Sequence, residues 1–369
     1  MKLAEKLKSL HKPRWAAALL IALLSAAVLT ASRRSTEFSD WLCFNVYPVF
    51  SGIGSRLWGI FPFSVGELFV ALVIAGTVVG AVFLTIHIVK SKGKRITAFL
   101  NGFSWAALAA SVIFLLVTLN CLVNYNRTPF SSYSGLTVRQ YSSEKLRELI
   151  VHLIEKVNEA AKEAELTEEG RAAKPGDFNA LAAAAMENLT EEYEVLDTYY
   201  PQPKAVICSD MMSSFNIAGM YFPVTVEANY NQAMPVSSQG FTVCHELSHL
   251  SGFIREDEAN FIAYLACRES ESPYFRYSGY LEALTYALNA YYPTADKEDY
   301  SALCSMLSDT VLNEYAYRNE YWAQFRKKTA YKVSSAINDA YLKSNNQTDG
   351  TKSYGRVVDL MLAEYWKED

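Results

Sequence analysis

Three long apolar runs lie in the first third of the chain, and much of the remaining sequence places apolar residues at helical spacing. The runs span residues 15–31, 68–89 and 97–123, and none of them contains a charged side chain. A helix of about 20 apolar residues is long enough to cross the hydrocarbon core of a bilayer. The pattern therefore predicts three membrane-spanning helices within residues 1–124, the first being a span or an uncleaved signal anchor.

The stretch between the first two runs, residues 35–66, is not a clean span. It is rich in aromatic residues, Gly and Pro, and Arg56 interrupts it. Aromatic side chains of this kind prefer the boundary between membrane and water. Two interpretations follow, an interfacial hairpin that guides a membrane-bound substrate or a packed connector, and the connector is favoured.

Basic residues set the expected orientation of the spans. One cluster lies in residues 2–14, before the first run, and a second lies at residues 90–95, between the second and third runs. Loops rich in Lys and Arg remain on the cytoplasmic side of a membrane. We therefore expect a multi-pass protein of the cell membrane, with a cytoplasmic N-terminus and an extracytoplasmic C-terminal part. Arg33 and Arg34 fall on the outer side and weaken this asymmetry.

The chain after the third run is expected to form a linker and one further domain. Residues 125–141 contain Pro, Ser and Gly and are the predicted linker, whereas residues 142–369 are the predicted domain. Ser143 is a suitable N-cap for its first helix. The fold class expected is mainly α (α+β), with a small edge sheet. Strands are expected at residues 204–209 and 217–226, and later helices at 178–196, 281–291, 300–317, 321–341 and 357–366.

One motif in this domain carries recognisable chemistry, His245-Glu246-x-x-His249. Residues four apart lie on one face of a helix, so the two imidazoles can bind one metal ion. The Glu beside the first His can then reach a water activated by the metal. The spacing predicts one bound Zn²⁺, with Glu246 as the general base in the hydrolysis of a peptide bond.

The third metal ligand is expected just after the motif, because a catalytic zinc usually has three protein ligands and an open position. Gly252 allows a sharp turn, and residues 256–260 (Glu-Asp-Glu-Ala-Asn) then open a second helix. Glu256 is the preferred ligand because Asn260, four residues later, can orient the ring of a ligand His. Glu258 is the alternative third ligand. If Glu256 binds the metal instead, Glu258 is expected to lie next to the ligand residues and support them.

The motif and the helix after it resemble the gluzincin metallopeptidases, whose third ligand is the Glu of an E-x-x-x-D helix; Asn260 stands where Asp is commoner. This resemblance implies a gluzincin-like fold in which an edge strand lies across the substrate cleft. The order Ala218-Gly219-x-Tyr221-x-Pro223, H-E-x-x-H, Glu-Asp-Glu-Ala-Asn and Tyr277-Ser-Gly-Tyr280 resembles the bacterial membrane-protein family of domain-of-unknown-function 3810. That family implies a zinc peptidase without a stated substrate.

Other polar residues are candidates for the cleft around the zinc. Tyr277 and Tyr280 are the expected catalytic partners, because a Tyr near zinc can stabilise an oxyanion. Tyr221, Glu227 and Asn229 are expected to bind substrate. In a chain with 24 Tyr, a packing role is the alternative for each of the tyrosines.

Composition narrows the classes of function. The net charge of −5 argues against a nucleic-acid partner. The six cysteines form no C-x-x-C pair, and Cys244 and Cys267 are expected to be buried thiols or, alternatively, a disulfide. The expected partners are a peptide or protein substrate and the lipid bilayer. The competing hypothesis is a non-catalytic zinc-binding membrane sensor or scaffold, which would not need Glu246.

Overall fold

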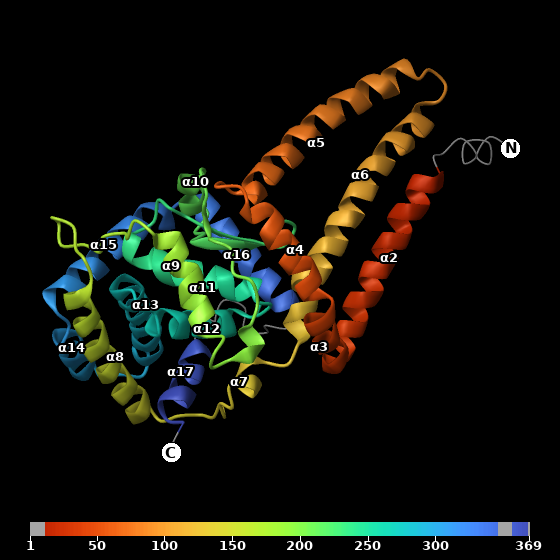
Figure 1. Ribbon diagram of the computed structural model, residues 1–369. Coiled ribbons are helices and arrows are strands. Elements are labelled where there is room, and N and C mark those ends of the chain that lie inside the picture. Colours follow the sequence, from red (N-terminus) through yellow and green to blue (C-terminus); the bar gives the residue numbers. More distant parts are fainter. Residues whose placement is uncertain (1–11, 346–355, 368–369) are drawn as a thin grey trace. The chain divides into compact units, whose positions relative to one another are not determined.

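The computed structural model describes residues 12–345 and 356–367, and most of these residues are helical (Figure 1). Contacts within the chain divide it into two compact units. The N-terminal unit comprises residues 1–50, 65–127 and 223–225, and the C-terminal unit comprises residues 51–64, 128–222 and 226–369. The division after Arg127 lies near the expected boundary at residue 124. Two short segments differ from the expectation: residues 51–64 belong to the C-terminal unit, and residues 223–225 belong to the N-terminal unit.

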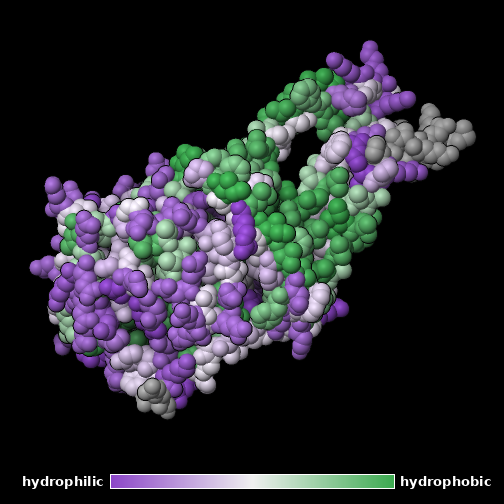
Figure 2. Space-filling model, in the orientation of Figure 1, coloured by the Kyte–Doolittle hydropathy of each residue, from purple (hydrophilic) through white to green (hydrophobic). Residues whose placement is uncertain are grey.

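Apolar helices form the N-terminal unit. Three helical stretches are long and apolar enough to cross a membrane, as the sequence predicts. They are α2 (Lys12–Arg34), α5 (Val65–Lys90) and α6 (Arg95–Val117), and α6 continues into a π-helical turn, η1 (Thr118–Leu122), and a 3-10 turn, η2 (Val123–Asn126). Hydrophobic side chains are exposed along α5 (Figure 2). Such a surface fits the lipid tails of a bilayer.

Small polar side chains join α2 to the next helix and to the end of α6. Helix α3 (Thr36–Asn45) begins after Ser35, whose side chain accepts a hydrogen bond from Phe38 N. Ser32 Oγ lies 2.9 Å from Ser39 Oγ. Contacts between small hydroxyl side chains let apolar helices approach closely while their polar atoms remain paired.

Residues 35–66 form two helices and a short exposed segment. Helix α3 is followed by α4 (Tyr47–Gly59), and residues 60–63 after α4 are all exposed. One side of α4 is buried through Ser51 and Ser55, whereas Ile53 is 64% exposed. The favoured interpretation as a packed connector therefore describes only one side of α4.

A central helix, α11 (Val236–Leu250), organises the C-terminal unit. It packs against α9 (Phe178–Asn188), α12 (Glu256–Arg268), α13 (Pro273–Tyr291) and the sheet. Thirteen of its residues are buried, so the helix is covered on nearly all sides. Further helices in the described part of the unit are most of α4, α7 (Phe130–Tyr133), α8 (Ser143–Glu163), η3 (Glu194–Leu196), α10 (Ser209–Ser214), α14 (Lys297–Ser305), α15 (Asp309–Arg326), α16 (Thr329–Ser344) and α17 (Val357–Tyr365).

A three-stranded sheet covers one side of α11. Its strands are β1 (Lys204–Ala205), β2 (Gly219–Phe222) and β3 (Glu227–Tyr230), in the order β1-β3-β2. Strand β3 pairs in parallel with β1 and antiparallel with β2, so β2 is an outer strand. Between β2 and β3, Val226 has a φ of 52°. This left-handed conformation is strained for a β-branched residue.

Several expected elements differ from the structure. The helix expected at 178–196 ends at Asn188, and the strand expected at 204–209 is only two residues long because α10 follows it. Strand β3 is not predicted at all. The helix expected from 300 to 317 is interrupted after Ser305, because the side chain of Ser308 caps a new helix by accepting from Val311 N. The cap of α8 is Ser142 rather than Ser143.

Candidate metal centre

Three potential metal ligands converge where α11 meets α12. The rings of His245 and His249 lie on one side of α11, with centroids 4.5 Å apart. Glu256, the first residue of α12, places Oε2 3.3 Å from His245 Nε2 and Oε1 3.9 Å from His249 Nε2. One ligand atom from each residue lies within 4.8 Å of the others. The structure therefore brings together the three residues expected to bind the metal.

A tight turn makes this convergence possible. Gly252 has a φ of 93°, a left-handed conformation that glycine adopts without a steric penalty. Phe253 N donates to Ser248 O at 3.2 Å, which folds the chain back over the end of α11. As a result, α12 begins beside the last turn of α11 and carries Glu256 to the two imidazoles.

The ring of His249 is oriented by the same turn. Its Nδ1 lies 2.9 Å from Phe253 O, and since a carbonyl can only accept, Nδ1 carries the proton. Nε2 is then the atom with a lone pair, and it is the atom that faces Glu256. Burial lowers the pKa of His249 to about 4. The ring is therefore neutral near pH 7, the form that binds a metal.

His245 has a different electrostatic environment. Burial lowers its pKa, but the hydrogen bond to Glu256, the charges of Glu256 and Glu246 and the side chain of Asn260 together raise it above its ordinary value. In the absence of a metal, a proton on His245 is thus stabilised by Glu256. A metal cation bound by these residues would take the place of that proton. Asn260 lies beside the ligand ring, where the sequence places it.

Glu246 lies between α11 and the outer strand β2. It is 5% exposed, and burial raises its pKa to about 8, although the nearby His245 and the backbone N–H of Tyr221 act in the opposite direction. A Cβ atom added at Gly219 would lie only 2.4 Å from Glu246 Oε1 and 2.8 Å from Thr242 Cγ2. Glycine at this position lets β2 approach the carboxylate.

The residues expected to bind substrate separate into two groups. The Tyr221 ring centroid lies 6.4 Å from that of His249, so Tyr221 is beside the candidate metal centre. Glu227 instead forms a buried ion pair with Lys204, whose Nζ is 2.5 Å from Glu227 Oε1. Asn229 donates to the carbonyls of Met220 and Glu227 within the sheet. Glu227 and Asn229 therefore bond within the sheet, and their side chains share the face of Phe222 and Met220, opposite to that of Tyr221.

Three other candidates also lie away from the cluster. Glu258 accepts hydrogen bonds from Phe130 N at 2.9 Å and from Arg255 at 3.3 Å, so its carboxylate is directed away from the imidazoles. Tyr277 is fully buried near Glu314 and Arg318. The ring of Tyr280 packs edge-on against Tyr264. The expected catalytic role of the two tyrosines therefore has no support in their positions, and Glu258 is not beside the ligands.

Comparison with protein families places the chain in a known group. Residues 44–362 match the family described as protein of unknown function (DUF3810). The chain belongs to this family. No curated protein and no solved structure matches the chain. The family resemblance expected from the motifs is thereby confirmed, and its description carries no activity.

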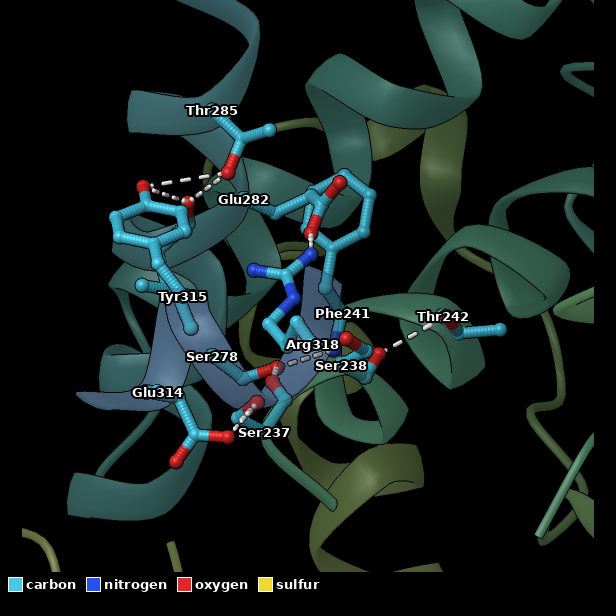
Figure 3. A network of polar contacts seen from close by, with 11 residues as sticks. Ser237, Ser238, Phe241, Thr242, Ser278, Glu282, Thr285, Glu314, Tyr315 and Arg318 are labelled. Carbon is cyan, nitrogen blue, oxygen red and sulfur yellow. Dashed lines mark hydrogen bonds and ion pairs between the residues drawn. The ribbon is translucent and has the colours of Figure 1, made fainter. Parts of the chain in front are cut away.

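In this DUF3810 chain, side chains of α13 hold the first turns of α11 in place. Ser278 Oγ accepts from Phe241 N at 2.9 Å and donates to Ser237 O at 2.5 Å (Figure 3). Tyr274 forms an equivalent pair, accepting from Gly240 N and donating to Val236 O. The N-terminal turns of α11 thus have polar partners although Pro235 provides no side-chain cap.

A buried carboxylate extends this network. Glu314, on α15, is 1% exposed and accepts from Ser237 Oγ at 2.7 Å (Figure 3). It also accepts from Ala172 N at 3.2 Å. Hydrogen bonds to a charged acceptor are stronger than those between neutral groups. Glu314 therefore fixes the start of α11 to a second helix in this DUF3810 chain. The sequence offers no local signal for this contact, because the partners are 77 residues apart.

The cysteines of the DUF3810 chain are all reduced in the structure. Cys244 and Cys267, on adjacent helices, are fully buried, and burial raises the pKa of Cys267 well above its ordinary value. A Cβ atom at Gly279 would lie 2.3 Å from Cys267 Cβ, which shows how closely α12 and α13 approach there. Buried thiols, rather than a disulfide, are what the structure contains.

Proposed function

We propose that this chain is a membrane-anchored zinc-dependent metallopeptidase. The observation that carries the proposal is the convergence of His245, His249 and Glu256 with a buried Glu246 next to the first ligand. A site for structural zinc needs ligands but no adjacent carboxylate held in a separate position. The four residues together supply the donors and the proton acceptor that hydrolysis needs.

The donor set fits Zn²⁺ on chemical grounds. Two imidazole nitrogens and one carboxylate are the ligands of many catalytic zinc sites. Ligand His residues usually donate the other ring N–H to a carbonyl or carboxylate, and His249 Nδ1 does so to Phe253 O. Zinc bound by these three residues would act as a Lewis acid that polarises a carbonyl and lowers the pKa of water.

Glu246 is positioned to move the proton. With a pKa of about 8 in the protein without metal, its carboxylate is close to the pH at which an efficient base and acid work. A cation held by His245 and His249 would lower this pKa and leave the carboxylate ionised at neutral pH. Glu246 would then take a proton from the attacking water and return it to the nitrogen of the leaving amine.

Strand β2 is the proposed seat for the peptide backbone. It is one of the two outer strands of the sheet, and its residue Gly219 lies against Glu246. An extended peptide can add to the edge of a sheet through main-chain hydrogen bonds. A peptide bound in this way would pass beside the proposed base. We also propose, from the basic clusters, that the C-terminal unit lies outside the cytoplasm.

Metal analysis of the purified full-length protein tests the ligand set. We expect one zinc per chain in the wild type and loss of zinc in His245→Ala, His249→Ala and Glu256→Ala. Glu258→Ala is the matched control, because this carboxylate is directed toward Phe130. Loss of zinc in Glu258→Ala with retention in Glu256→Ala would refute the assignment of the third ligand.

Digestion of a peptide library tests catalysis. Glu246→Gln should keep its zinc but lose about 100-fold or more in turnover, the usual contribution of a general base. Glu269→Gln is the control, because it makes the same Glu-to-Gln change at an exposed residue, the C-cap of α12. Equal activity of Glu246→Gln and wild type would assign the hydrolysis to another group or a contaminant. Stoichiometric zinc with no cleavage by the wild type would favour the alternative, a non-catalytic zinc-binding sensor or scaffold.

A further inference from the structure

The C-terminal unit carries an exposed apolar surface beside the candidate metal centre. One part of it lies on and next to α10, where Ile207 is 76% exposed and Met211 58% exposed. A second part follows α4, where Ile60 is 75% exposed. We call these residues the apolar rim, and its members are Leu57, Ile60, Phe61, Phe63, Ile207, Met211, Phe215 and Met220. Figure 2 shows hydrophobic residues gathered around α10 and α4.

The sheet connects the two parts of the rim. Residues paired across strands point to the same face, and Lys204 and Met220 both pair with Asn229. Lys204 Nζ donates to Trp58 O at 2.6 Å, so the end of α4 lies on the face that Met220 shares. Gly219 and Tyr221 alternate with Met220 and face α11 and Glu246. One face of β2 thus adjoins the candidate metal centre, and the other belongs to the rim.

The part of the apolar rim at α10 is held in a fixed orientation. Met211 is exposed on α10, and Ile207 and Phe215 are exposed just before and just after the helix. The opposite side is buried through Met212 and Ser213, and Ser213 Oγ lies 2.5 Å from Tyr321 OH on α15. The exposure of Met211 therefore results from a packed helix that presents this side chain outward.

The chain itself indicates what covers the rim. Phe63 and Ser64 are followed directly by α5, the most apolar of the candidate spans, with a hydropathy of 2.6. At 1.5 Å per residue, its 26 residues are about 39 Å long, more than the ~30 Å thickness of a hydrocarbon core. The end of α5 at Val65 then lies at the membrane boundary. An extended chain covers at most about 3.6 Å per residue, so Phe63 is within about 7 Å of that end.

The chemistry around the rim fits the same boundary. Trp58 packs against Phe61, and Phe61 packs against Phe63, with centroid distances of 6.4 and 5.6 Å. The guanidinium of Arg56 lies 4.4 Å from the Tyr199 ring, and both residues are exposed. Aromatic and Arg side chains are suited to the headgroup level, because each has an apolar body and a polar end.

We propose that the apolar rim binds the headgroup region of a lipid bilayer and holds the β1–α10–β2 edge at the membrane surface. If the proposed peptidase function also holds, the substrate class follows: extended segments of membrane-anchored proteins close to the point where they leave the bilayer. The membrane contact itself does not depend on catalysis.

Lipid quenching in the full-length protein tests the contact. Cys208 and Cys304 are the cysteines outside the buried class, and both are replaced by Ser in the background variant. An environment-sensitive fluorophore is then attached to Met211→Cys. The matched control is Met306→Cys, which changes the same residue type at a site that is 44% exposed next to α14. In Figure 1, α10 lies at the top of the C-terminal unit and α14 at its lower left edge.

After reconstitution into phosphatidylcholine vesicles, lipids spin-labelled near the headgroup should quench the probe at residue 211 but not the probe at 306. Absence of quenching at both positions would overturn the proposal. If only a second copy of the chain that carries a spin label quenches the probe, the rim is a protein interface. This result would also overturn the proposal. Unchanged circular dichroism of the labelled variants shows that each has folded.

A second experiment separates the membrane contact from catalysis. Met211→Glu with Phe215→Glu should reduce cleavage of a peptide anchored in the vesicle and leave cleavage of the same soluble peptide at the wild-type rate. Met306→Glu should leave both rates unchanged. Equal loss for both peptides would overturn the inferred substrate class. If the wild type cleaves neither peptide, the proposed function fails, whereas the quenching result still decides the membrane contact.

Discussion

Gly219→Ala is the substitution for which the structure gives the sharpest expectation. The added Cβ would lie 2.4 Å from Glu246 Oε1, 2.7 Å from Glu246 Cγ and 2.8 Å from Thr242 Cγ2. Ordinary van der Waals contact begins at 3.4 Å. Either the Glu246 carboxylate or β2 must therefore retreat by about 1 Å, and a misplacement of that size can cost about 100-fold in rate.

The same crowding has a predictable effect on stability. Adding a methyl group to a packed site typically costs about 1–3 kcal/mol in the free energy of unfolding. The metal ligands lie on α11 and α12, so zinc content should remain at the wild-type value. We therefore expect a folded, somewhat destabilised, zinc-loaded protein in which peptide hydrolysis falls by about 100-fold.

The assay compares this variant with Gly176→Ala. Gly176 has no atom within 4 Å of an added Cβ, and its φ is not in the left-handed region, so that variant should match the wild type. Zinc content, thermal unfolding and hydrolysis are measured on the same preparations. Wild-type turnover in a destabilised Gly219→Ala protein would refute the proposed site, because the clash must displace either the proposed base Glu246 or the strand proposed to seat the peptide.

Two further predictions concern the surroundings of the site. Lys204→Met leaves the buried Glu227 without its cation and should cost about 3–5 kcal/mol in the free energy of unfolding. The double variant Lys204→Met, Glu227→Leu should recover part of this lost stability. Chemical denaturation in detergent measures the stability of both variants. Burial lowers the pKa of Lys174 to about 8, so between that pH and 10.5 the unfolded chain binds more protons and stability should rise with pH. Lys174→Met should remove this rise, and an unchanged pH profile would show that Lys174 titrates alike in both states.

The convergence of the three candidate metal ligands could be predicted because they are local in the sequence. His245, His249 and Glu256 lie within twelve residues, and one helix, one turn and the start of another helix bring them together. Asn260 follows from the same helical spacing, since it is one turn beyond Glu256. The family could be identified from the order of such motifs. The gluzincin fold and the chemistry remain predictions.

The predicted site residues that lie away from the cluster, and the strand that was not predicted, depend on contacts distant in the sequence. Glu227 looks like a cleft residue until its partner Lys204, 23 residues earlier, is known. Tyr277 and Tyr280 lie on α13, and the packing of α13 on α8, α11 and α12 decides which side of that helix faces the metal. Strand β3 was missed because it has only four residues, Glu-Ala-Asn-Tyr, and three of them are of types that are uncommon in strands.

The division of the chain between the two units has a practical consequence for dissecting this protein. A fragment that starts after Arg127 would lose residues 51–64, and with them the Trp58 carbonyl that accepts from the buried ammonium of Lys204. It would also separate Pro223 from Asn120, whose side chain donates to the Pro223 carbonyl at 2.8 Å, between the two strands beside Glu246. We therefore expect a fragment that starts after Arg127 to lose two supports of its own sheet, and the C-terminal unit is better studied within the full chain.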